Sequence, residues 1–302
     1  MRACWYGWLL FLTATGCNSR REQTREFNGD SALAYVKTQL AFGPRIPNTE
    51  GHVKAGDWIV AQLRSRADTV ETQAFTHVAV GGETLKLRNI IGRFRPDQPD
   101  RILLLAHWDS RPRSEHSANV GDQLRPLPGA NDGASGVAVL LGVADALKHQ
   151  PPNVGVDLLF VDGEDYGDFT VDKDVLLGSR YYATHLPAGP KPLFAVLFDM
   201  VGDADLSIFE ESNSVMNAPE VVERVWNRAA ELGFGKAFRP SAVYGLTDDH
   251  IPLQKAGIRA IDVIDFDYGP NNSYWHTIDD TIDKVSARSL AIVGEVAVSL
   301  AR

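Results

Sequence analysis

The sequence predicts one α/β domain built on an open, mostly parallel (mixed) central sheet with helices on both faces. Two observations support this prediction. Short apolar segments alternate with segments of helical spacing along most of the 302 residues. Two of the short segments, RILLLA at 101–106 and VDLLFV at 156–161, are almost continuously apolar, which is typical of strands covered on both faces. With 44% hydrophobic residues, the chain can bury a large core.

The first third of the domain predicts two helices and then two strands. Residues 31–40 and 52–67 have apolar positions at helical spacing. The loop between them, FGPRIPNTEGH, is interrupted by Pro and Gly residues, which are typical of turns. Residues 69–76 and 85–94 read as strands, and the second contains the β-branched stretch NIIGRF.

The rest of the chain alternates buried strands with helical segments. The expected strands cover 101–106, 156–161, 193–198 and 260–264, and the expected helices cover 135–148, 179–186, 219–232, 251–256 and 286–301. Strands joined through helices form a parallel sheet, and ligands bind such sheets at the carboxyl ends of the strands. Side chains that directly follow a strand are therefore the first candidates for a functional site.

The N-terminus reads as a processing signal. Arg2 precedes a short apolar stretch at 8–12, which is too short to span a bilayer and has the layout of a secretory signal peptide. The following Ala-Thr-Gly-Cys resembles a bacterial lipobox, which predicts export and a lipid anchor on Cys17; the alternative is simple cleavage and a soluble periplasmic product. The expected division is a signal peptide at 1–17, a flexible tether at 18–29 and the domain at 30–302.

Charge and cysteine content exclude several kinds of site. The formal charge of −9 argues against a nucleic-acid-binding protein, which usually carries a basic face. Cys4 and Cys17 are the only cysteines, and both lie in the N-terminal segment. The body of the protein therefore has no thiolate nucleophile and no Cys-ligated zinc site, so any metal must be held by His and carboxylate side chains.

Polar residues follow three of the expected strands. His107 and Asp109 follow RILLLA, the pair Glu164-Asp165 follows VDLLFVDG, and Asp199 follows LFAVLF. Adjacent carboxylates at the end of a buried strand repel each other, and burial makes this worse. Something must compensate for their charge.

Two further residues complete the candidate site. Asp132 lies in the Gly-rich loop PGANDGASG, where it would also serve as a helix cap or turn residue, and His276 follows Trp275, where it would also fit as a packed histidine. Two His and several carboxylates at one sheet edge together match the mixed N/O ligands of zinc. Because successive residues of an extended chain face opposite sides, Asp165 can bind the ion while Glu164 faces a water or substrate.

These segments resemble the zinc aminopeptidase family that also contains the glutaminyl cyclases. The resemblance runs from about residue 41, including FGPRIPNTEGH, to about residue 285. It implies that Glu164 is the general acid/base and that Asp109 orients His107. It also implies that Asp132, Asp165 and His276 are zinc ligands, joined by His107 and Asp199 if a second zinc binds, as in the two-metal aminopeptidases.

Three features favour the cyclase branch of this family. Asp248 and Asp249 in DDHIPL resemble the segment whose acidic residue bonds the substrate amide, and Trp275 lies in a WHT-x-DD stretch that resembles one lining the pocket. The spacing from Glu164 to Gly178-Ser179-Arg180 is longer than in ordinary aminopeptidases, and aligned with the cyclase pattern it puts Phe169 where a pocket Trp is expected. The resemblance implies that Asp199 and Asp249 assist Glu164 in catalysis. Two residues depart from the pattern: Asp165 replaces a Glu, and Phe169 replaces a Trp.

The resemblance implies a zinc enzyme that acts on peptide or protein N-termini. The cyclase reading predicts one zinc and cyclisation of N-terminal glutamine; the aminopeptidase alternative predicts two zincs and hydrolysis of the first peptide bond. A third reading is a binding protein without catalysis. We expect a monomer, no nucleic-acid partner, and membrane contact only through a lipid at Cys17.

Overall fold

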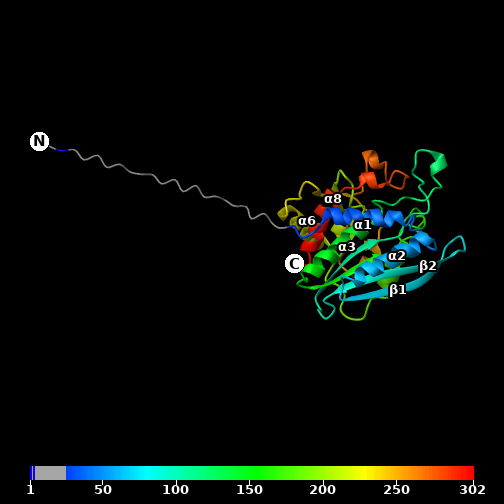
Figure 1. Cartoon of the computed structure of the whole chain (residues 1–302), viewed down its shortest axis with the longest axis horizontal. Coiled ribbons are helices and arrows are strands. Elements are labelled where there is room, and N and C mark those ends of the chain that lie inside the picture. Colours follow the sequence, from blue (N-terminus) through cyan, green and yellow to red (C-terminus); the bar gives the residue numbers. More distant parts are fainter. Residues whose placement is uncertain (2, 4–24) are drawn as a thin grey trace.

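The computed structural model describes residues 1, 3 and 25–302, and its folded part is the single α/β domain that the sequence predicts (Figure 1). Its strands are β1 Thr69–Val78, β2 Thr84–Phe94, β3 Arg101–His107, β4 Gly155–Val161, β5 Ala195–Asp199, β6 Ile208–Glu211, β7 Phe238–Tyr244 and β8 Ala260–Ile264. Its α-helices are α1 Gly29–Ala41, α2 Glu50–Arg64, α3 Ala134–His149, α4 Leu177–Thr184, α5 Ser212–Asn217, α6 Pro219–Glu231, α7 His250–Lys255 and α8 Ala287–Ser299. Short 3₁₀ helices cover Val120–Asp122, Pro270–Asn272 and Ile282–Lys284.

The central sheet has six strands in the order β1-β2-β4-β3-β5-β8. The pairs β1–β2 and β2–β4 are antiparallel, whereas β4–β3, β3–β5 and β5–β8 are parallel. The mixed, mostly parallel sheet is therefore confirmed. Because β4, β3 and β5 are neighbours and run parallel, their carboxyl ends meet at one edge, as the site prediction requires.

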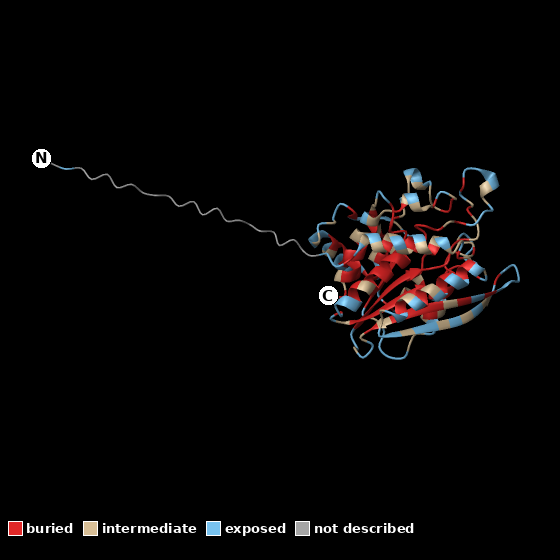
Figure 2. Ribbon diagram, viewed as in Figure 1, coloured by how far each residue is buried: buried red, intermediate tan, exposed pale blue. Residues whose placement is uncertain are grey.

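Helices cover both faces of the sheet. Helices α1, α2, α3, α6 and α8 contribute to the larger apolar core, which packs against residues such as Leu104, Leu158 and Val196. Helices α4 and α7 cover the other face, where Tyr182 and Leu253 pack with Leu105 and Leu197. In Figure 2 the buried strands and the inward sides of the helices form a continuous interior, while exposed residues lie on the outer sides of the helices. Leu104 belongs to the larger core and Leu105 to the core on the other face, so these neighbours in β3 point to opposite faces, as expected for a strand.

Most expected elements agree with the structure to within a few residues, and the differences have local causes. The helix expected from residue 52 begins at Glu50, because the Thr49 side chain accepts a hydrogen bond from the His52 amide and caps it. The strand expected from residue 193 begins at Ala195. The short helix α5 and the pair β6–β7 were not expected. These two strands form a separate sheet, and β7 is mostly exposed and contains Pro240, so it lacks the pattern of a buried strand.

The domain begins earlier than the expected boundary at residue 30. Phe27 is buried in the core, its amide donates to Glu295, and α1 starts at Gly29. Residues 27–29, at the C-terminal end of the predicted tether, therefore pack on the domain, and the division of the chain stays a prediction. The predicted signal peptide and Cys17 lie outside the described residues.

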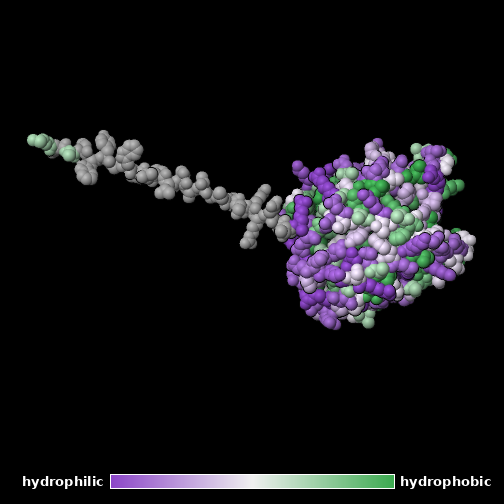
Figure 3. Space-filling view, viewed as in Figure 1, coloured by the Kyte–Doolittle hydropathy of each residue, from purple (hydrophilic) through white to green (hydrophobic). Residues whose placement is uncertain are grey.

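The outer surface of the domain is mainly hydrophilic in the view of Figure 3, with smaller hydrophobic areas between the hydrophilic ones. Among the residues that the structure describes, no helix is both long and apolar enough to cross a membrane.

Candidate active site and metal centre

The strand ends bring the predicted residues together at one edge of the sheet. His107 is the last residue of β3 and Asp199 the last of β5, while Glu164 and Asp165 follow β4 after a short turn. All four are buried. The His107 Nε2 atom lies 3.1 Å from Asp199 Oδ1, so the neighbouring strands place their polar ends in direct contact.

Two groups of potential metal ligands share Asp132. In the first group, His276 Nε2 lies 3.6 Å from Asp132 Oδ2 and 3.5 Å from Asp165 Oδ1. In the second group, His107 Nε2 lies 3.1 Å from both Asp132 Oδ1 and Asp199 Oδ1. Tetrahedral zinc with bonds of about 2.0–2.1 Å separates its ligand atoms by about 3.3 Å. The spacings of both groups fit that geometry.

The chemistry of the first group also fits zinc. Imidazole nitrogen and carboxylate oxygen are both zinc ligands, and three protein ligands are usual at a catalytic zinc. Asp165 Oδ2 is buried and has no hydrogen-bond partner among the described residues, which leaves a lone pair available. A cation would compensate for the excess of buried carboxylates. The residues present therefore fit the metal that the sequence predicted.

The loop that carries Asp132 is held by Asp280, the last residue of the WHT-x-DD stretch. Asp280 accepts hydrogen bonds from the Asn131 amide at 2.8 Å and from the Asp132 amide at 3.2 Å. It also accepts one from the Tyr268 hydroxyl at 2.8 Å. A side chain on the following Gly133 would come within 2.3 Å of the His107 ring, so glycine allows the loop to approach that ligand. This role of Asp280 was not predicted.

Asp109 has a different contact from the one expected. Its Oδ1 lies 3.6 Å from His107 Nδ1, which is too long for a hydrogen bond. The carboxylate instead accepts the backbone amides of Glu164 at 3.0 Å and Asp165 at 3.2 Å. Asp109 therefore orients the acidic pair, and His107 Nδ1 is left without a hydrogen-bond partner among the described residues.

Burial and mutual repulsion shift the pKa values of the acidic groups. Burial raises the pKa of Glu164 well above its ordinary value; nearby His107 opposes this shift, and Asp165 reinforces it. Burial and the charge of Asp132 raise the pKa of Asp165 to about 7. For His107, burial lowers the pKa, but the charge of Asp199 and hydrogen bonds to carboxylates outweigh burial and raise it well above the ordinary value. Burial without a cation therefore favours the protonated forms of Glu164 and Asp165.

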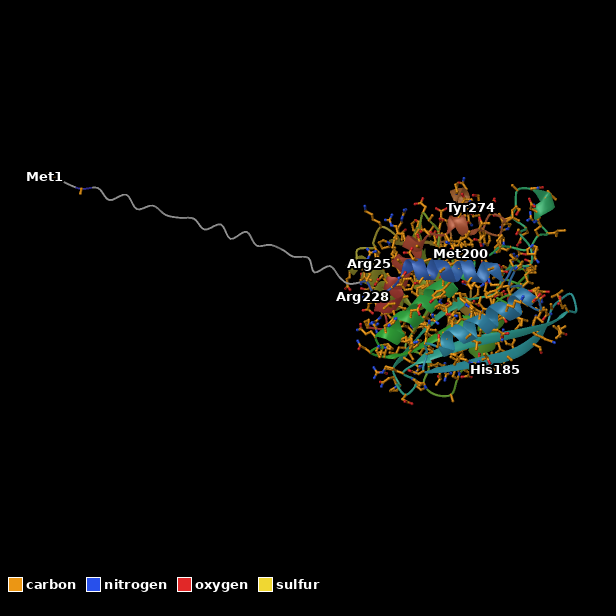
Figure 4. All side chains as sticks on the ribbon, in the orientation of Figure 1. Met1, Arg25, His185, Met200, Arg228 and Tyr274 are labelled. Carbon is orange, nitrogen blue, oxygen red and sulfur yellow. The ribbon has the colours of Figure 1, made fainter. Side chains whose placement is uncertain are left out.

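A cavity of about 220 Å³ opens beside the two ligand groups. Its apolar walls come from several loops and strand ends: Phe169, Met200, Leu246, Ile264, Phe266 and Trp275. Its polar walls are Asp132, Glu164, Asp165, Asp199, Thr247, Asp248 and His276. Met200 and Tyr274, which pack in one cluster with Trp275, lie in the same part of the domain in Figure 4, away from His185. The predicted pocket residues Trp275, Phe169 and Asp248 are therefore brought together.

Asp249 is placed elsewhere. It does not line this cavity; its carboxylate accepts a hydrogen bond from the Ser179 hydroxyl of α4. Adjacent residues at the start of α7 point in different directions, so only Asp248 reaches the pocket. Asp248 is therefore the member of the pair that lines the cavity, and the catalytic role of Asp249 stays a prediction.

A buried pair behind the pocket was also missed. His250 Nε2 lies 3.2 Å from Glu211 Oε2, and both residues are fully buried. Glu211 also accepts the amide of Leu246, a residue of the pocket wall. His250 lies in the DDHIPL segment, but nothing in the sequence pairs it with Glu211, because Glu211 ends the unexpected strand β6.

Arg45, in the loop FGPRIPNTEGH, connects two segments that carry site residues. Its side chain is fully buried and donates to the backbone oxygens of Trp108 at 3.0 Å and Gly129 at 2.8 Å. These contacts join the segment after β3 to the loop that carries Asp132. The motif therefore has a structural role beneath the site.

Comparison with known proteins agrees with this geometry. The sequence profile of peptidase family M28 matches residues 89–301. The chain is 27% identical over 293 residues to aminopeptidase YwaD of Bacillus subtilis, and the match covers 91% of this chain but 57% of that protein. The chain thus spans little more than half the length of this relative.

Solved structures are similar over nearly the whole domain. A Zn-dependent exopeptidase from Parabacteroides distasonis is 38% identical with a TM-score of 0.86, covering 91% of this chain and 97% of the other. Tannerella forsythia glutaminyl cyclase is 39% identical with a TM-score of 0.86, covering 91% and 98%. Since the profile spans most of the domain and includes all the candidate ligands, the chain belongs to peptidase family M28.

Proposed function

We propose that the protein is a zinc-dependent glutaminyl-peptide cyclotransferase, which converts an N-terminal glutamine to pyroglutamate and releases ammonia. The observation that carries this choice is Asp248 in the wall of a small, largely apolar cavity beside Glu164. A buried carboxylate can accept the N–H groups of a glutamine side-chain amide. Asp248 Oδ1 already accepts the Asp249 amide, but an apolar residue in the pocket would offer this buried carboxylate no further partner.

In the proposed reaction, some residues bind the glutamine and Glu164 transfers the proton. The aromatic rings of Trp275 and Phe169 enclose the glutamine side chain, and Asp248 orients its amide. Glu164 takes a proton from the α-amine as that nitrogen attacks the side-chain carbonyl carbon. Glu164 then gives the proton to the departing nitrogen, which leaves as ammonia when the carbon–nitrogen bond of the amide breaks. A raised pKa suits a group that both accepts and releases a proton.

The proposed zinc ligands are Asp132, Asp165 and His276. Zinc bound there supplies electrophilic polarisation of the carbonyl that is attacked. We expect one ion for the cyclase, with Asp199 and His107 contributing a polar wall beside it.

One observation favours the alternative, a zinc aminopeptidase. His107, Asp132 and Asp199 form a second complete ligand group, and a two-metal site needs such a group. In that reaction Glu164 would deprotonate a water that cleaves the first peptide bond. The two reactions share the base and differ in the nucleophile, amine or water.

The deciding experiment uses the purified domain, loaded with zinc. Bound zinc is counted, ammonia release from Gln-peptides is measured, and release of N-terminal residues such as Leu is followed in parallel. One zinc with ammonia release supports the cyclase. Two zincs with release of Leu, and no cyclisation, would overturn it in favour of the aminopeptidase.

We further propose that residues 1–17 direct export, that a lipid on Cys17 anchors the mature chain, and that the substrates are N-termini of peptides or proteins. The enzyme is proposed to act as a monomer. Labelling with a radioactive fatty acid, abolished by Cys17→Ala, tests the anchor; sedimentation of the purified domain tests the oligomeric state.

A further inference from the structure

The segment after β3 contacts two of the proposed zinc ligands from outside. Arg111 is buried, and its Nη1 donates to Asp165 Oδ1 at 2.6 Å and to the backbone oxygen of Asp165 at 3.1 Å. The guanidinium thus holds the backbone and the side chain of the same residue. A charge-assisted bond of this kind is short and directional, so it fixes the carboxylate relative to its own main chain.

The other side of Arg111 faces Glu115. Its Nε donates to both oxygens of Glu115, at 2.7 Å and 2.9 Å. Glu115 Oε1 in turn lies 3.4 Å from His276 Nδ1. The opposite nitrogen of that ring, Nε2, faces Asp132 and Asp165. The two nitrogens of His276 therefore have separate tasks, one toward the ligand group and one toward Glu115.

This arrangement follows a general rule of metal sites. A ligating histidine usually gives its second N–H to a carboxylate, which fixes the tautomer and the orientation of the ring. Glu115 is correctly placed for this on His276. Two ligands from distant parts of the chain are then linked by one chain of contacts: Asp165, Arg111, Glu115 and His276.

We propose that Arg111 and Glu115 are positioning residues for the zinc ligands Asp165 and His276, and that Arg111 offsets the short side chain of Asp165. Aspartate is one methylene shorter than glutamate, so it reaches an ion only if its backbone and carboxylate are both held in place. Arg111 holds both. The inference rests on the proposed zinc site and extends it to two residues that do not bind the ion.

The competing explanation is that the Arg111–Glu115 pair only stabilises the loop at 110–127. A structural role would change the unfolding temperature and leave zinc affinity intact. Arg125 provides a matched control, since it is an arginine of the same loop whose Nη1 pairs with Asp122 Oδ1 at 2.7 Å. Its ion pair is exposed and does not involve a proposed ligand.

The test compares the zinc dissociation constants of wild type, Arg111→Met, Glu115→Gln and Arg125→Met, by competition with a chromophoric chelator. Zinc affinity should fall about 10- to 100-fold in Arg111→Met and Glu115→Gln. It should stay within about threefold in Arg125→Met. Arg111→Lys restores the charge but not the double contact, so it should recover only part of the affinity.

Cobalt-substituted protein gives a second readout that is independent of turnover. The visible absorption of Co²⁺ depends on the geometry of its ligands, so both variants should change the spectrum and Arg125→Met should not. The thermal midpoint of each metal-free protein shows whether it is folded. If Arg111→Met does not fold, Glu115→Gln, which removes one charge at nearly constant shape, decides the question.

Wild-type affinity and spectrum in the folded Arg111→Met and Glu115→Gln variants would overturn the positioning role and leave the zinc site standing. A wild-type protein that binds no zinc would overturn both proposals.

Discussion

The two ends of β3 and β4 both contain buried charges, but they are compensated in different ways. At the amino end, Arg101 donates to Asp157 through Nε at 3.0 Å and through Nη2 at 2.6 Å. A further N–H of Arg101 donates to the backbone oxygen of Gln98 at 2.9 Å. At the carboxyl end, Arg111 pairs with Asp165 Oδ1, but the buried carboxylates outnumber this arginine and the two histidines, and Asp165 Oδ2 has no partner among the described residues.

The difference separates a structural ion pair from a functional site. Arg101 and Asp157 satisfy each other, so nothing further is needed for them to remain buried. The carboxyl end has more buried acids than bases, and only protons or a bound cation can balance them. An uncompensated cluster in a cavity is the stronger indication of chemistry.

The largest expected effect is at the carboxyl end. Glu164→Gln keeps the shape of the side chain but removes the acid/base, so kcat should fall about 10²- to 10⁴-fold. Bound zinc, measured by atomic absorption, should remain at the wild-type level because Glu164 is not a proposed ligand. A variant that keeps more than about a tenth of wild-type kcat would remove Glu164 from its role.

At the amino end, a substitution should lower stability and leave zinc content and kcat unchanged. Asp157→Asn leaves the Arg101 charge buried without its partner, so the free energy of unfolding should fall by about 3–5 kcal/mol in urea denaturation. Zinc content and kcat of the folded variant should match wild type. If zinc were lost while the protein remained folded, the two ends would not be independent.

Without zinc, the excess of buried carboxylates at the carboxyl end should make the stability of the protein depend on pH. Burial raises the pKa values of Asp165 and Asp280 to about 7, with the charge of Asp132 adding to both shifts, and the pKa of His107 is raised as well. A raised folded-state pKa stabilises the protein at low pH, and this stability is lost as pH rises through the folded value. The metal-free midpoint should therefore fall by about 5 °C between pH 6 and 8.

The zinc-loaded protein is the control for this measurement. A bound cation compensates the same carboxylates, so its midpoint should fall less over this range. If the midpoint depended on pH equally in both forms, the bound metal would not be what compensates the charge of these carboxylates.

The smallest effect is expected at the pocket wall. Phe169→Trp enlarges the aromatic surface and adds an indole N–H, so KM for a Gln-peptide should fall about threefold while kcat stays within about twofold. Phe169→Ala should raise KM and is the matched control. A large change in kcat without a change in KM would place Phe169 outside substrate binding.

The residues directly after the strands could be predicted from the sequence. RILLLA, VDLLFV and LFAVLF read as buried strands, and in a parallel sheet their carboxyl ends meet at one edge. His107, Glu164, Asp165 and Asp199 were therefore expected to lie together without any distance being known. Asp132 and His276 were added because they complete a mixed set of His and carboxylate ligands, and the family resemblance then implied their roles, because each comes from a loop that the strand pattern alone does not place.

Side-chain directions in the loops were decided by the tertiary structure. Asp248 and Asp249 are equivalent in the sequence, yet only the first lines the cavity, because Ser179 of another helix holds the second. Asp109 binds the amides of the acidic pair instead of His107 for the same kind of reason. Such contacts join residues far apart in the chain, and no local pattern records them.

The sequence by itself thus determined the fold class, the edge of the sheet that carries the site, and the residue types available to a metal. Only the tertiary structure decided that Asp248 and not Asp249 lines the cavity, and that Arg111 and Glu115 link two of the proposed ligands. The physical reason is that strand periodicity is a local property of the chain, whereas loop hydrogen bonds depend on partners brought together by folding.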